Sequence, residues 1–171
     1  LSKLVKDLME LARADSNKTQ INKEKVDVDK LIAQVAEPFE EMAKLADKKI
    51  ELKLNYKKDL EIDKNKIHEV LVIILDNSMK YTEKGDTITI STTEKDGKLV
   101  LDIADTGIGI SDEGINHVFE RFYREDKARS RETGGSGLGL SLANTIIQEH
   151  GGTIRAMHNN PKGTIIEIKI K

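Results

Sequence analysis

The chain has 171 residues, of which 37% are hydrophobic and 34% charged, and its formal net charge is −2. This length suits one globular domain with a short appendage, and the composition excludes a disordered chain or a membrane-spanning apolar run. The near-neutral charge gives no reason to expect a nucleic-acid groove, and the absence of cysteine excludes disulfides and thiolate metal sites.

The N-terminal region carries apolar side chains at helical spacing over its first fourteen residues, which predicts the end of an amphipathic helix. Because the chain begins with Leu1 inside this pattern, we expect it to be a piece of a longer protein. Residues 16–25 are polar and show no periodicity, so they predict a linker. The expected organisation is a helix stub at 1–15, this linker, and one domain at 26–171.

The first half of the domain shows two helical patterns and several alternating ones. Val26 and Val28 predict a short strand, and Asp29 is expected to cap the helix that follows. Asp63 is expected to cap a strongly apolar helix over 64–80. Alternating apolar residues predict strands at 50–54, 87–93 and 98–104, the last two joined by a turn at Asp96–Gly97.

The second half of the domain predicts one long helix and a final hairpin. A short helix is expected near 111–119, and a longer one over 138–150 ends at Gly151–Gly152. Strands at 153–158 and 164–170 complete the pattern. Three long helices and a mixed, mostly antiparallel sheet predict an α+β fold, a two-layer α/β sandwich with an N-terminal helix stub.

Polar side chains interrupt the apolar helix near its C-terminal end. Asn77, Lys80 and Tyr81 follow an apolar run over 70–75, and their spacing of three and four places them on one face. An amide oxygen can bind Mg²⁺, and a nearby ammonium can neutralise phosphate. The alternative interpretation is a helix end at which surface polarity simply resumes.

A second polar motif follows the strand at 98–104. Asp105 is succeeded by Gly107 and Gly109. A carboxylate at a strand end can accept a hydrogen bond from an exocyclic amine such as that of adenine, and glycines allow a close approach. The same residues also fit an ordinary turn.

The third motif, Gly-Gly-Ser-Gly-Leu-Gly-Leu at 134–140, opens the last helix. Glycines before a helix leave free N–H groups at the positive end of its dipole, which suits phosphate. The lysine of a P-loop and the dinucleotide fingerprint are both absent from it.

The two glycine-rich motifs are separated by a stretch of roughly twenty-five residues with little predicted order, which favours a lid over about 110–136. Its basic residues could fold over a triphosphate, and its aromatic residues could anchor a base. These residues are Arg121, Arg124, Lys127, Arg129 and Arg131, with Phe119, Phe122 and Tyr123. For any single arginine, a solvated loop is the simpler interpretation.

The order of these motifs resembles the histidine-kinase branch of the gyrase-type, or Bergerat-type, ATPase fold. An Asn-x-x-Lys-Tyr helix, an Asp-x-Gly-x-Gly strand end, a Phe-x-x-Phe-Tyr segment and a Gly-x-Gly-x-Gly turn occur in that family's order over residues 26–170. The resemblance implies the catalytic domain of a sensor histidine kinase, which binds ATP with Mg²⁺ and donates the γ-phosphoryl group to a histidine.

The resemblance also implies roles for individual residues. Asn77 would ligate the metal, Lys80 and Arg124 would act on the phosphates, and Asp105 would accept a hydrogen bond from the adenine amine. The remaining residues that it assigns to the nucleotide site are Tyr81, Gly107, Gly109, Ile110, Phe122, Gly135, Gly137, Leu138, Gly139, Leu140 and Thr164.

One position departs from both branches of the family. Hydrolytic relatives place a glutamate one helical turn before the metal asparagine, and many histidine kinases place a second asparagine there, but this chain has Ile73. An aliphatic side chain cannot take a proton from water. Transfer to a neutral imidazole needs mainly positioning and charge neutralisation, so Ile73 favours phosphotransfer over hydrolysis.

The phosphoacceptor histidine is expected upstream of Leu1. None of His68, His117, His150 and His158 lies in the family's His-Glu/Asp-x-x-Thr/Asn-Pro setting. The resemblance implies that 1–15 ends a dimerisation and phosphoacceptor hairpin, and that a response-regulator receiver domain is the partner. It further implies a homodimeric, membrane-anchored parent with this domain in the cytoplasm.

Two alternatives from other functional classes remain open at this point. One is an ATP-hydrolysing or serine-kinase relative of the same fold. The other is a non-catalytic module that only binds nucleotide and changes shape.

Overall fold

The computed structural model describes residues 2–16, 20–125 and 136–171. Its main sheet contains five strands, and β2 pairs with β4 in parallel while the remaining neighbours are antiparallel. In spatial order the strands are β2 (Lys49–Leu54), β4 (Thr87–Lys95), β5 (Lys98–Asp105), β7 (Thr164–Ile170) and β6 (Thr153–His158). This mixed sheet confirms the expected fold class.

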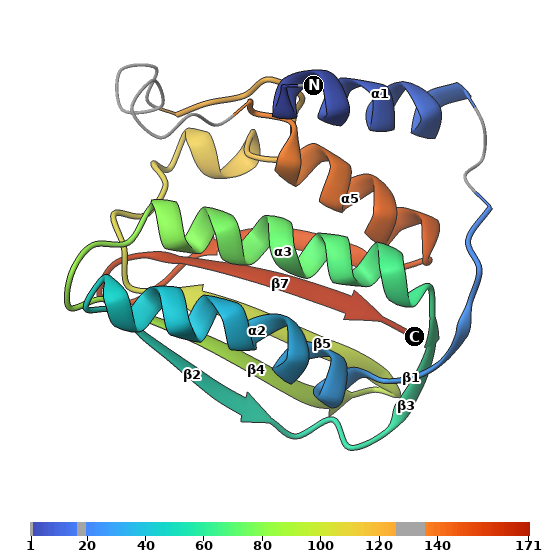
Figure 1. Cartoon of the computed structure of the whole chain (residues 1–171), viewed down its shortest axis with the longest axis horizontal. Coiled ribbons are helices and arrows are strands. Elements are labelled where there is room, and N and C mark those ends of the chain that lie inside the picture. Colours follow the sequence, from blue (N-terminus) through green and yellow to red (C-terminus); the bar gives the residue numbers. More distant parts are fainter. Residues whose placement is uncertain (1, 17–19, 126–135) are drawn as a thin grey trace.

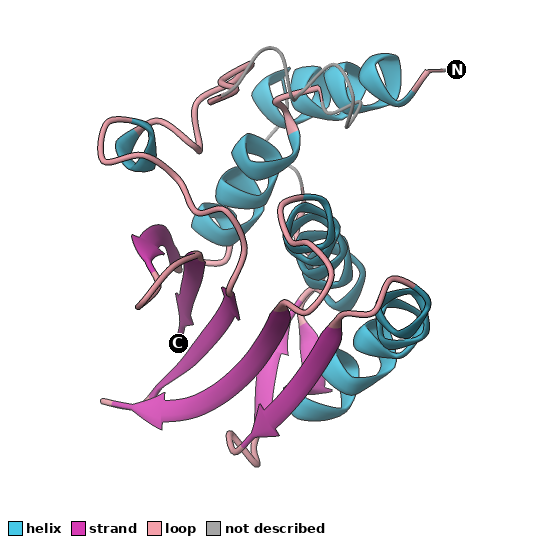
Figure 2. Cartoon of the chain, turned by 90° about the vertical axis from the view of Figure 1, so that its left-hand side faces the viewer, coloured by secondary structure: helices cyan, strands magenta, loops and turns pink. Residues whose placement is uncertain are grey.

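Helices cover one face of the sheet, and no described helix covers the other (Figure 2). The covering helices are α2 (Val28–Leu45), α3 (Lys64–Lys80) and α5 (Gly139–Glu149). A fourth helix, α1 (Lys3–Ser16), contacts α5 and lies outside this layer (Figure 1). None of the described helices is long and apolar enough to cross a membrane.

The core lies between the sheet and the helices because the strands alternate. Ile88 and Ile90 on β4 are completely buried, and Ile103 on β5 is 1% exposed. They pack in one cluster with the apolar face of α3, including Leu71 and Ile74. Each such side chain contributes about 1.5–3 kcal/mol when it leaves water, so this cluster holds α3 firmly against the sheet.

The start of α2 differs from the prediction. Asp27, not Asp29, caps the helix, because its side chain accepts a hydrogen bond from Lys30 N at 3.0 Å. Val28 is therefore helical. The Asp29 carboxylate instead accepts from Thr92 Oγ1 at 2.6 Å and from Tyr56 N at 3.1 Å. These partners are distant in the sequence, so local spacing could not distinguish the two aspartates.

Two small elements also differ from the prediction. The strand β3 (Asp59–Ile62) was not expected, and it pairs with β1 (Glu24–Asp27) in a separate two-stranded sheet. Four residues are too few to show a clear alternation. The short helix expected near 111–119 is a single 3₁₀ turn at Gly114–Asn116. By contrast, Asp63 caps α3 as predicted, accepting from Lys66 N at 3.1 Å.

Candidate functional site

A cavity of about 540 Å³ opens between the end of α3, the end of β5 and the start of α5. Residues from all three predicted motifs share it, so one ligand can reach each of them. The predicted site residues among its lining are Asn77, Lys80, Tyr81, Asp105, Gly109, Ile110, Arg124, Gly137, Gly139, Leu140 and Thr164.

Four predicted site residues are not among the described lining residues of the cavity. Gly107 is absent from the described lining but adjoins two lining residues, Asp105 and Tyr81. Leu138 is completely buried beneath the start of α5. Phe122 is 57% exposed and touches Gly137 through its backbone. Gly135 lies outside the described residues, as do three lid cations. These are Lys127, Arg129 and Arg131.

Asp105 stands at the buried end of the cavity and is 6% exposed. Its Oδ1 accepts hydrogen bonds from Gly107 N at 3.0 Å and Thr164 N at 3.3 Å. Burial raises the pKa of this carboxyl, although the two backbone donors partly oppose the shift. Because Asp105 lines the cavity, its carboxylate can accept a hydrogen bond from a ligand there, which suits the amino group of a purine.

Gly107 is required by close packing between two elements. A Cβ at this position would lie 2.1 Å from Tyr81 O, at the end of α3. The neighbouring Ile108 N donates to the same carbonyl at 3.1 Å. This contact binds the end of β5 to the end of α3, so that Asp105 and Asn77 face one cavity.

The start of α5 meets the lid through Gly137. This glycine has a φ of +76°, and a Cβ on it would lie 2.9 Å from Phe122 Cα. Phe122 N donates to Gly137 O at 2.9 Å. No described side chain caps α5, and unpartnered N–H groups at a helix start attract anions.

The charged groups of the cavity cluster at the end of α3. Lys80 Nζ lies 3.0 Å from Asp76 Oδ2, and Lys3 Nζ of α1 lies 3.4 Å from the same oxygen. Glu69 and Ile73 line the cavity from the same face of α3. Ile73 is close to the start of α5, since a Cβ added to Gly139 would lie 3.2 Å from Ile73 Cγ2.

Several lining residues were missed by the sequence analysis. Glu69 and Asp76 could have been found, because they precede Asn77 and Lys80 at helical spacing on one face. Lys3 and Asp7 could not, since only the docking of α1 brings them to the cavity. Glu125 also lines it and accepts a hydrogen bond from Ser111 N, whereas Tyr123, another lining residue, was expected as a lid aromatic.

Residues 62–171 match the family model described as "Histidine kinase-, DNA gyrase B-, and HSP90-like ATPase". The chain belongs to this family. Among curated relatives of this ATPase domain, it is 40% identical over 169 residues to the sensor histidine kinase WalK of Bacillus subtilis. That match covers 96% of this chain and 27% of WalK, so the chain spans about a quarter of that relative's length.

Solved structures lead to the same family. The Acinetobacter baumannii histidine kinase AdeS superposes with a TM-score of 0.79 and 28% identity, over 98% of this chain and 76% of AdeS. Full-length ShkA, solved in complex with AMPPNP, gives a TM-score of 0.86 over 98% of this chain and 35% of ShkA. Its 24% identity supports the fold alone. The chain is thus a histidine-kinase-type ATPase domain.

Proposed function

We propose that this domain binds Mg·ATP and donates the γ-phosphoryl group to a histidine on the dimerisation and phosphoacceptor domain of the same protein. From there the phosphoryl group would pass to an aspartate of a response-regulator receiver domain. The observation that carries the proposal is that Asn77, Asp105 and the start of α5 line one cavity.

The buried end of the cavity suits adenine. The Asp105 carboxylate, fixed by two backbone donors, would accept from the adenine amino group. Thr164 and Tyr81 also line the cavity, and Tyr81 offers an aromatic ring for the base. This end would select the nucleobase.

The other end suits a triphosphate with its metal. The open start of α5 provides N–H donors, and Lys80 and Arg124 provide cations. The Asn77 amide oxygen would hold Mg²⁺, with Asp76 and Glu69 as further oxygen donors in the same lining. Bound Mg²⁺ would neutralise charge that develops on the transferred phosphoryl group.

Ile73 favours transfer over hydrolysis. It occupies the cavity wall one turn before Asn77 and packs near Gly139, so the wall there is aliphatic. No proton acceptor stands at that position to activate water. A neutral imidazole needs no such base, since its lone pair attacks the γ-phosphorus directly while the bond to the β-γ bridging oxygen breaks and ADP leaves.

The organisation of the parent protein belongs to the same proposal. Residues 1–15 would end the phosphoacceptor hairpin, 16–25 would form a linker, and 26–171 would form the catalytic domain with a lid at about 110–136. The parent would be a membrane-anchored homodimer with this domain on the cytoplasmic side. The similarity to WalK, whose name is that of a sensor histidine kinase, supports a parent of that class.

The proposal is tested with γ-labelled ATP, using the chain alone and the full-length parent. We expect Mg-dependent ATP binding by the chain without self-labelling, and an acid-labile phosphohistidine in the parent. An acid-stable product would indicate a serine kinase, and phosphate release without protein label would indicate an ATPase. ATP binding without transfer in the parent would indicate a non-catalytic module.

A further inference from the structure

Helix α1 contributes side chains to the nucleotide cavity although it lies outside the helix layer of the domain. Both Lys3 and Asp7, one turn apart on α1, line the cavity. In the sequence they are separated from the nearest other lining residue, Glu69, by more than sixty positions. The cavity is therefore completed by a segment that precedes the rest of the fold, and α1 runs alongside α5 (Figure 1).

Two polar contacts hold α1 in this place. Lys3 Nζ lies 3.4 Å from Asp76 Oδ2, and Ser136 Oγ donates to Asp7 Oδ2 at 3.1 Å. Asp76 belongs to α3, and Ser136 belongs to the glycine-rich turn before α5. The same Asp76 oxygen holds Lys80 Nζ at 3.0 Å, so the two ammonium groups converge at the phosphate end of the cavity.

The charge balance of the cavity makes this convergence important. Its described lining holds more carboxylates than cations. The carboxylates are Asp7, Glu69, Asp76, Asp105 and Glu125, and the cations are Lys3, Lys80 and Arg124. A triphosphate entering such a cavity is repelled unless each nearby cation turns toward it. Lys3, with its side chain 65% exposed on a flexible stem, can do so.

We propose that Lys3 is a phosphate-binding residue of the nucleotide site, brought there by the docking of α1. This inference rests on the proposed function, since it needs a polyphosphate ligand at that end of the cavity. Asp76 keeps the two lysines in place before the ligand arrives, and the phosphates then take over the Lys3 ammonium. Nucleotide binding and α1 docking therefore strengthen each other by the same factor.

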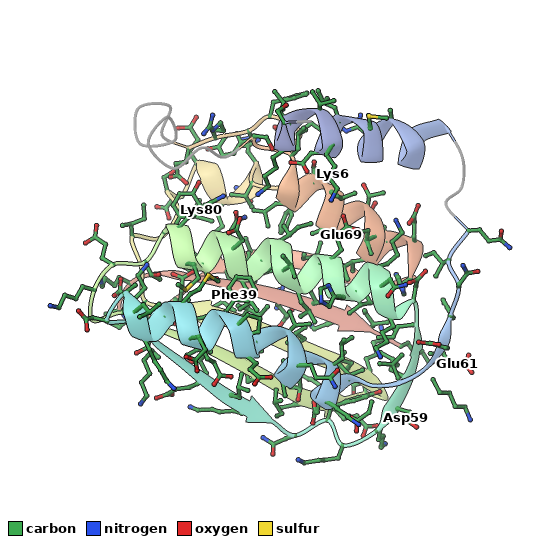
Figure 3. The ribbon with its side chains drawn as sticks, viewed as in Figure 1. Lys6, Phe39, Asp59, Glu61, Glu69 and Lys80 are labelled. Carbon is green, nitrogen blue, oxygen red and sulfur yellow. The ribbon has the colours of Figure 1, made fainter. Side chains whose placement is uncertain are left out.

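The test compares Lys3→Gln with Lys6→Gln in the 171-residue chain. Lys6 lies three residues along the same helix (Figure 3), carries the same charge and is absent from the described lining. Binding of Mg·ATP is measured by calorimetry, and binding of adenosine by NMR titration, which reaches millimolar affinities. Lys3→Gln should weaken ATP binding about 3- to 10-fold and leave adenosine binding within twofold.

Three outcomes would overturn the inference. They are unchanged ATP affinity in Lys3→Gln, a parallel loss of adenosine affinity, and an equal loss of ATP affinity in Lys6→Gln. Unchanged ATP affinity would mean that Lys3 does not contact the phosphates. A parallel loss of adenosine affinity would indicate a merely structural role for Lys3, and an equal loss in Lys6→Gln would indicate long-range charge alone. If the wild-type chain did not bind Mg·ATP at all, the proposed function itself would fail, which is a distinguishable result.

A double-mutant cycle tests whether docking delivers Lys3. Asp7→Ala removes the contact with Ser136. In the wild-type background it should weaken ATP binding, because α1 no longer holds Lys3 at the phosphates. In the Lys3→Gln background it should cause no loss. An equal loss in both backgrounds would contradict delivery of Lys3 by α1.

Discussion

The Asp105 side chain is held in one orientation by hydrogen bonds from the backbone. Two backbone N–H groups hold its Oδ1, and its burial raises its pKa. An asparagine could still accept these bonds, but its NH₂ group would meet the adenine amino group as a second donor. Asp105→Asn should therefore weaken ATP binding about 10- to 100-fold. ATP-induced thermal stabilisation measures this loss.

The matched control for this variant is Asp102→Asn on the same strand. Asp102 pairs with Glu167 in the β5–β7 register and is not among the described lining residues. ATP binding should stay within twofold of the wild type. A comparable loss in Asp102→Asn would mean that the effect of Asp105→Asn reflects damage to β5 and not a lost ligand contact.

The two aspartates should also give a pH dependence of the same sign. Burial, followed by the Glu167 charge, raises the pKa of Asp102, and its Oδ1 has no partner among the described residues. A carboxyl with a raised folded pKa favours folding while protonated, and this contribution disappears as the pH rises through that pKa. The stability gain of either asparagine variant over wild type should grow above pH 3.8, the ordinary carboxyl value, in denaturant titrations.

Ile73 is expected to decide between transfer and hydrolysis. Ile73→Glu would place a proton acceptor one turn before Asn77, where the wild type has an aliphatic wall. A general base contributes about 10²–10⁴ in rate, so phosphate release from ATP should rise at least about 10-fold. Ile73→Leu is the control and should leave release unchanged. Unaltered hydrolysis in Ile73→Glu, with ATP binding intact, would contradict this role.

At the scale of elements, α3 positions the site because both of its ends are fixed. Asp63 caps its start, and Lys48 closes its end by donating to Met79 O at 2.7 Å and Thr82 O at 2.8 Å. Met79 O lies in the last turn of α3, where carbonyls lack partners within the helix, and Thr82 O lies just beyond the helix. Asn77 and Lys80 lie in this last turn, so the order of the site depends on a cation from the loop after α2.

Lys48→Met should lower the free energy of unfolding by about 1–2 kcal/mol, because it removes two charge-assisted bonds at a helix C-terminus. Chemical denaturation measures the change. Lys44→Met, at the end of α2, is the control. Its pair with Glu41 is 3.7 Å long and highly exposed, so its loss should be at most about 0.5 kcal/mol. Equal effects would contradict a specific role for Lys48.

At the scale of the whole molecule, His150 joins distant parts of the fold. The residue is 4% exposed, its Nε2 accepts from Asp63 N at 3.0 Å, and its Nδ1 contacts Ile146 O at 2.7 Å. It thus connects the end of α5 to the start of α3. These contacts give His150 a structural role in the fold.

His150→Ala should lower the free energy of unfolding by about 1–3 kcal/mol, since it leaves the buried Asp63 N–H without its partner. His68→Ala, on the exposed face of α3, should stay within about 0.5 kcal/mol of wild type. Thermal and denaturant unfolding of both variants provide the comparison. A neutral effect of His150→Ala would indicate that water replaces the ring.

By itself, the sequence determined the elements and motifs whose signals are local. Alternation predicted the long strands, Asp63 predicted the start of α3, and the order of the four motifs predicted the family. Such signals depend on neighbours within a few residues, which share a helix face or a strand face.

Only the tertiary structure decided the contacts between distant residues. Asp27 rather than Asp29 caps α2, and Asp29 instead accepts a hydrogen bond from Thr92 of β4. Likewise, Lys3 reaches the cavity because α1 docks beside α5. Neither contact produces a pattern of residues at a fixed spacing in the sequence. Such pairings are selected by burial and charge once the core has formed, so they appear only when the packed molecule is in view.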